Sequence, residues 1–192
     1  MNRTDQLALW WEEARLGNVA SFGLIHRDLY VGLYHYLLKI LKDDEVAEDI
    51  LQDVFVKLWE RKEKLGVIFN VKVYFYKAAR SMALNYIKRN KFIFIRDEEV
   101  CVEVVFSQEE AVVLQENNIE KNKLLFEALN RLPKRQREIL FLKYFDEWEY
   151  DHIAAVTGIK YQSVVNHVHR AILQLRSDLV GAGCGSFSRI AV

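Results

Sequence analysis

Apolar side chains recur at steps of three and four residues along nearly the whole chain, a spacing typical of amphipathic helices. The pattern is clearest between residues 43 and 60, where one side of a helix would carry Val46, Ile50, Leu51, Val54 and Leu58. The opposite side is rich in carboxylates and amides. This segment therefore predicts a helix with a strongly acidic outer face.

Three other segments in the first half of the chain show helical spacing, at residues 7–15, 19–41 and 71–89. Alternation with a period of two residues appears only briefly. One proline and eight glycines provide fewer turns than a sheet protein of 192 residues requires. We expect an all-α fold, in which residues 1–96 form a first small helical domain.

Residues 97–118 interrupt the helical pattern. Between residues 97 and 120 there are eight acidic residues and no lysine or arginine, and uncompensated acids resist burial. The string VCVEVVF favours β-structure but is too short and isolated to build a sheet. We interpret residues 97–118 as a flexible acidic linker.

A second helical domain is expected over residues 119–180, with the glycine-rich residues 181–192 as a disordered tail. Within it, residues 150–179 show the pattern of a helix, a tight turn at Gly158 and a second helix. The second helix would be anchored by Val164, Val168, Ile172 and Leu175. This leaves the amides of Gln162 and Asn166 on its outer face, where they could bond an adenine edge in the major groove. The simpler alternative is a helical hairpin with a solvated outer face.

Composition and charge narrow the class of protein. Hydrophobic residues make up 51% of the chain and charged residues 28%, which excludes a disordered chain. The formal net charge is zero, yet charges alternate in blocks, acidic at 43–63, basic at 80–96, acidic at 97–120 and basic at 121–143. We expect several separate electrostatic faces, although solvated helix faces could produce part of this pattern.

No segment predicts membrane insertion or a signal peptide, so we expect a cytoplasmic protein. The motifs of phosphate-binding loops, dinucleotide folds, serine hydrolases and zinc proteases do not occur. His167 and His169 are two residues apart and would point to different faces of a helix, so we expect no metal and no cofactor. Asp49 and Asp53 share a helix face but fit a docking surface better than a catalytic pair.

Basic and aromatic residues alternate between Arg80 and Arg96, with Tyr86, Phe92 and Phe94 among the cations. This mixture suits single-stranded nucleic acid, because unstacked bases pack on aromatic rings while the backbone attracts positive charge. An ordinary core stripe with a solvated edge explains the composition equally well.

The string EVAEDILQDVFVKLWERKEKL resembles the acidic helix of the extracytoplasmic-function sigma factors, which belong to the sigma-70 family of bacterial RNA polymerase subunits. The resemblance extends over roughly residues 7–179. It implies that this helix docks on core RNA polymerase through Asp49, Gln52, Asp53, Phe55 and Trp59.

The string VYFYKAARSMALNYIKRNK resembles the helices with which the family opens the downstream promoter element. Ser81 replaces the usual asparagine and Tyr74 an expected tryptophan. The resemblance implies a role in promoter opening for Tyr74, Tyr76, Arg80, Ser81, Asn85, Lys88 and Arg89.

The region from Leu132 to Leu179 resembles the family's second domain, which reads the upstream promoter element. The resemblance implies DNA contacts by Lys160, Gln162, Ser163, Asn166, His167, His169 and Arg170. It implies a transcription initiation factor that is not an enzyme, with core RNA polymerase, promoter DNA and an anti-sigma factor as partners. A sigma-like decoy that binds an anti-sigma factor and a helix-turn-helix repressor are the alternatives.

Overall fold

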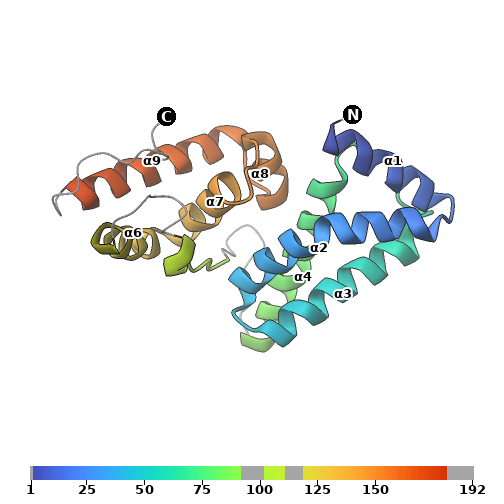
Figure 1. The fold of residues 1–192 in the computed structure, drawn as a ribbon, viewed down its shortest axis with the longest axis horizontal. Coiled ribbons are helices and arrows are strands. Elements are labelled where there is room, and N and C mark those ends of the chain that lie inside the picture. The colour runs from blue at the N-terminus through green and yellow to red at the C-terminus, as the bar shows by residue number, and fades with distance from the viewer. Residues whose placement is uncertain (1, 92–101, 111–118, 181–192) are drawn as a thin grey trace. The chain divides into compact units, whose positions relative to one another are not determined.

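The structure is a computed structural model that describes residues 2–91, 102–110 and 119–180 (Figure 1). All regular secondary structure in these residues is helical, and the chain divides into two compact units. The predicted all-α fold with two small helical domains is confirmed. Each unit is described by itself below.

The first unit is built from four helices, α1 (Arg3–Arg15), α2 (Val19–Leu41), α3 (Asp44–Arg61) and α4 (Val71–Lys91). The long helix α2 contacts all three others. Its start is fixed by Asn18, whose side chain accepts a hydrogen bond from the amide of Ser21, and Asp43 caps α3 in the same way through the amide of Val46. Such caps satisfy amides that have no partner within the helix.

Large side chains fill the core of the first unit. Trp11 of α1 meets Phe75 of α4 edge to face, with ring centroids 6.1 Å apart. Helices α2 and α4 approach closely at Gly32, where an added Cβ would lie 2.6 Å from the hydroxyl of Tyr76. Glycine at this position thus allows the buried Tyr76 ring to pack between the two helices.

The later helices are α6 (Ile119–Arg131), α7 (Lys134–Tyr144), α8 (Tyr150–Thr157) and α9 (Tyr161–Val180). The second unit contains α6, α7, α9 and the first part of α8. Pro133 immediately precedes α7, where its lack of an amide proton costs no helical hydrogen bond. Gly158 has a φ of +73° and joins α8 to α9, as the turn pattern predicts. The apolar anchors predicted for α9 are all buried, namely Val164, Val168, Ile172 and Leu175.

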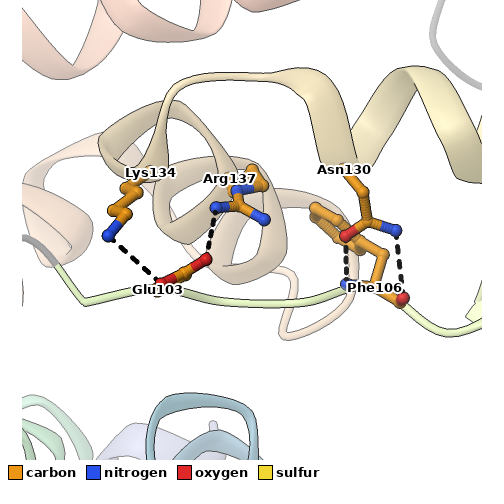
Figure 2. Close-up of polar contacts among 5 residues, drawn as sticks. All are labelled: Glu103, Phe106, Asn130, Lys134 and Arg137. Carbon is orange, nitrogen blue, oxygen red and sulfur yellow. Dashed lines mark hydrogen bonds and ion pairs between the residues drawn. The ribbon is translucent and has the colours of Figure 1, made fainter.

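Part of the predicted flexible linker belongs to the second unit. Val102, Val104 and Phe106 are almost completely buried, whereas Val105 between them is exposed. The expectation of uncompensated acids is wrong for Glu103, because cations of α7 lie beside it (Figure 2). The rest of the predicted linker, residues 97–101 and 111–118, and the tail at 181–192 lie outside the described residues.

Candidate functional site

The acidic face of α3 has the predicted geometry. Asp49, Gln52 and Asp53 are exposed, while Ile50 and Val54 are buried on the opposite side. Asp53 forms an ion pair with Lys57 one turn later, at 3.1 Å. Both side chains are more than half exposed, so this pair contributes little to stability, and the carboxylate can exchange Lys57 for a partner's cation.

Phe55 does not belong to that exposed face, and its role as a docking contact stays a prediction. Its ring is buried, with centroids 4.5 Å from His26 and 5.3 Å from Phe75. Phe55 therefore holds α3 against its neighbours from inside. Trp59 is only partly covered; its ring lies 5.0 Å from that of Phe22, and the Lys62 ammonium sits 3.9 Å above it.

Two tyrosines of α2 border the acidic helix, and sequence reasoning missed them. The Tyr30 hydroxyl donates to Glu48 at 3.2 Å, and the Tyr34 hydroxyl donates to Asp44. The hydrogen bond to Asp44 is the main reason that the pKa of Tyr34 rises to about 12. Partial burial, followed by the bond to Glu48, raises the pKa of Tyr30. The four-residue spacing of these tyrosines placed them on one face but did not identify α3 as their neighbour.

On α4 the structure separates the predicted residues into two groups. Ser81, Asn85 and Arg89 follow one another at steps of four residues and are exposed, with Tyr74 and Lys88 half-buried. These five remain candidates for contact with nucleic acid. Phe92 and Phe94 lie outside the described residues.

Tyr76 and Arg80 are buried in the first unit, and their role in promoter opening stays a prediction. Tyr76 is buried, with its ring 5.3 Å from that of Tyr36 and the Lys72 ammonium 5.7 Å away. Arg80 is 7% exposed. Helix α4 contacts α1, α2 and α3, so its buried arc is wider than a single apolar stripe indicates.

The helix-turn-helix of α8 and α9 presents the predicted polar face. Lys160, Gln162, Asn166, His169 and Arg170 are exposed, and Ser163 is half-buried. The Nε2 of Gln162 donates to the Oδ1 of Asn166 at 3.4 Å, so the two amides lie one turn apart and side by side. A helix with this outer face and a buried opposite face can lie in a major groove and present amides to base edges.

His167 differs from its neighbours because it is half-buried. Burial lowers its pKa, and the nearby Arg135 and Arg170 guanidinium groups lower it further. Its Nδ1 atom is buried, and the described part of the protein offers it no hydrogen-bond partner. The lowered pKa favours the uncharged imidazole, so Arg170 and Lys160 are the better candidates for phosphate contact.

Neither a membrane span nor a metal site is found in the described part of the chain. None of its helices is long and apolar enough to cross a bilayer. No cluster of three histidine, cysteine or acidic side chains among residues 2–91, 102–110 and 119–180 could hold a metal ion. The described helices include a helix-turn-helix, α8 and α9, and a helix with an acidic exposed face, α3.

Comparison with known families identifies the chain. The model of sigma-70 region 2 matches residues 25–93, and the model of sigma-70 region 4 matches residues 123–175. The first match falls on α2 to α4 and the second on α6 to α9. The chain therefore belongs to the sigma-70 family, as a transcription initiation factor of the extracytoplasmic-function group.

Known sigma factors align with this chain over most of their own length. RNA polymerase sigma factor YlaC of Bacillus subtilis is 25% identical over 158 residues, which cover 81% of this chain and 90% of YlaC. The extracytoplasmic-function sigma factor SigW of the same organism is 23% identical and covers 77% of this chain and 82% of SigW. The sigma factor RpoE of Bartonella quintana, solved with the anti-sigma factor NepR, has a similar fold, with a TM-score of 0.58, 20% identity and coverage of 84% and 98%.

Proposed function

We propose that this sigma factor binds core RNA polymerase in the cytoplasm and directs it to a subset of promoters. The observation that carries the proposal is that the two family matches, and the two candidate helices, fall on different units. The unit that matches region 2 carries the acidic helix, and the unit that matches region 4 carries the helix-turn-helix. We place the first domain at residues 1–96 and the helix-turn-helix domain within residues 119–180.

Core polymerase would bind the acidic face of α3. Asp49, Gln52 and Asp53 offer two carboxylates and an amide on the exposed side of a helix whose other side is fixed by packing. A basic surface of the polymerase would replace Lys57 as the partner of Asp53. Charge complementarity of this kind sets orientation and association rate as well as affinity. Trp59, partly exposed at the end of the same helix, would extend the contact.

Promoter opening would use the exposed stripe of α4. Ser81 and Asn85 offer hydrogen bonds to unpaired bases, Arg89 and Lys88 offer positive charge to the backbone, and Tyr74 offers an aromatic face. This combination fits a separated strand better than a closed duplex, because only unpaired bases expose their faces for stacking.

The upstream promoter element would be read by α9. Gln162 and Asn166 would contact base edges in the major groove, while Lys160 and Arg170 would contact phosphates. Ser163 and His169 flank the amides and would add contacts at the edges of the same site.

An anti-sigma factor would hold the protein inactive until a signal releases it. Support for this partner comes from RpoE of Bartonella quintana, whose structure was solved in complex with the anti-sigma factor NepR. The fold that RpoE shares with this chain makes a similar inhibitory complex the natural expectation.

The test is transcription in vitro from genomic DNA, with purified core polymerase and the full-length protein, followed by sequencing of transcript 5′ ends. A sigma factor should produce new start sites that share an upstream and a downstream element. A helix-turn-helix repressor or a decoy would bind DNA or an anti-sigma factor without producing any start site, and that result would contradict the proposal.

A further inference from the structure

An extended stretch of chain, residues 102–107, lies along the second unit and is called the strap here (Figure 2). Its side chains alternate between two environments. Val102, Val104 and Phe106 are 1%, 0% and 1% exposed, whereas Val105 is 36% exposed. Such alternation is typical of an extended peptide with one face against a surface.

Phe106 gives the strap an aromatic anchor. Its ring centroid lies 5.5 Å from that of Phe145 and 6.5 Å from that of Phe141, at the end of α7. Aromatic pairs at such distances stabilise more than their buried area alone. At the end of the strap, Ser107 forms reciprocal side-chain to backbone hydrogen bonds with Glu110, at 3.3 and 2.7 Å, which fix the chain as it leaves the surface.

Asn130 of α6 clamps the backbone of the strap. Its Oδ1 accepts from the Phe106 amide at 3.0 Å, and its Nδ2 donates to the Phe106 carbonyl at 3.2 Å (Figure 2). The same Nδ2 donates to the Phe126 carbonyl at 3.1 Å, which holds the amide group in place. A side chain that bonds both backbone groups of one residue recognises an extended peptide as a neighbouring strand would, whatever that residue's side chain.

Glu103 adds a charged contact. Its carboxylate lies 3.1 Å from Lys134 Nζ and 3.5 Å from Arg137 Nη2, both on α7. The Arg137 side chain is only 8% exposed, and a nearly buried guanidinium is costly without a carboxylate beside it. The surface therefore favours a peptide with an acidic residue between two apolar ones.

We propose that α6 and α7 form a binding surface for an extended acidic peptide with alternating apolar residues, and that the strap occupies it as an intramolecular ligand.

A docked strap also affects the spacing of promoter elements, an effect that rests on the proposed function. Ten residues separate Lys91 from Val102, whereas 27 separate Lys91 from Ile119. An extended chain spans at most about 3.6 Å per residue, so a docked strap shortens the connection between the DNA-contacting units and limits the spacing of promoter elements that they accept.

Adjacent valines provide a matched pair of variants in the full-length chain. Val104→Asp places a charge on the buried side of the strap, and Val105→Asp places the same charge on its exposed side. We expect chymotrypsin to cleave after Phe106 at least ten times faster in Val104→Asp than in wild type, and Val105→Asp to behave as wild type. Glu103→Lys, a milder change, should give an intermediate rate. Equal cleavage of the wild type and Val104→Asp, or equal effects of both valine changes, would overturn the docking.

A labelled peptide of residues 101–110 tests the binding surface directly. A short tether gives an intramolecular ligand an effective concentration on the order of 1 mM, so an occupied surface implies an affinity tighter than that. The peptide should bind the Val104→Asp protein at least ten times more tightly than it binds wild type, and a Glu103→Lys peptide should bind more weakly. Absence of binding to the Val104→Asp protein up to about 1 mM peptide would contradict the proposal. Equal affinities of the wild-type and Glu103→Lys peptides would also contradict it.

The functional consequence is measured separately, by transcription from one promoter whose two elements are moved apart in single base-pair steps. Val104→Asp should use a wider range of spacings than wild type and Val105→Asp. Identical profiles for the three proteins would contradict the spacing role. Inactivity of the wild type at every spacing would instead contradict the proposed function, while the protease and peptide results would still decide whether the strap docks.

Discussion

The outer faces of α3 and α9 are built on similar amphipathic helices but carry opposite chemistry. On α3 the exposed face includes Asp49, Gln52 and Asp53, and Asp53 forms a local ion pair with Lys57. On α9 the exposed face includes amides, a histidine and cations. The proposed function accordingly assigns a basic protein surface to α3 and DNA to α9. Variants on the α3 face should therefore impair polymerase binding, and variants on the α9 face should impair DNA binding.

The largest effect is expected from Phe55→Ala, which tests the inner side of α3. The ring is packed among His26, Phe22 and Phe75, and loss of a buried phenylalanine typically lowers the free energy of unfolding by about 3–5 kcal/mol. Chemical denaturation measures this value. A loss of stability below about 1 kcal/mol, combined with weaker polymerase binding, would show that Phe55 contacts polymerase directly.

Charge reversal on the outer side of α3 should act on binding and not on folding. Asp53→Arg should weaken the affinity for core polymerase by more than about 1 kcal/mol, because a complementary charged contact becomes repulsive. Titration of labelled protein with core polymerase measures the change, and the circular dichroism spectrum should stay the same. Lys57→Ala is the matched control, since it removes the local ion pair but leaves the carboxylate. An unchanged affinity of Asp53→Arg would contradict the docking role of α3.

On α9, Asn166→Ala should relax base preference at one position of the upstream element by about 1–3 kcal/mol. The hydrogen bond from Gln162 to Asn166 predicts that the effects of Gln162→Ala and Asn166→Ala are not additive. A set of single-base promoter variants, bound by wild type, both single variants and the double variant, measures preference and coupling together. A uniform loss over all bases would show that Asn166 does not read sequence.

The smallest effect is expected from Arg170→Ala. A phosphate contact carries no sequence information, so affinity should fall equally for every promoter variant and the salt dependence should decrease by about one unit. Binding at two salt concentrations checks this result. If the preferred base changes instead, Arg170 contacts a base edge, which is the role proposed for Asn166.

Sequence spacing was enough to predict the helices, the turn at Gly158 and the outward position of Asp49, Asp53 and Asn166. It failed where one helix packs against several others. Phe55 follows Val54, and Tyr76 follows Phe75; each pair is buried because α3 and α4 each contact more than one neighbour. A single apolar stripe describes a helix with one neighbour, and wider burial becomes visible only when the packing is known.

The strap shows a second limit of sequence reasoning. Counting charges along residues 97–120 indicated repulsion, but Lys134 and Arg137 lie beside Glu103 only in the folded chain. The alternation of Val102, Val104 and Phe106 was a valid signal of a half-buried extended segment. It could not reveal that its partners are helices instead of another strand.

The most direct test of separate polymerase and DNA surfaces is a run-off transcription assay in which core polymerase is titrated against wild type, Asp53→Arg and Asn166→Ala. Excess polymerase should restore Asp53→Arg to the wild-type level of transcript and leave its promoter preference unchanged. It should not restore the preference of Asn166→Ala, which should accept substituted upstream elements at every polymerase concentration. The same response of both variants to polymerase, or no promoter-dependent transcript with wild type, would contradict the assignment of α3 to polymerase and α9 to DNA.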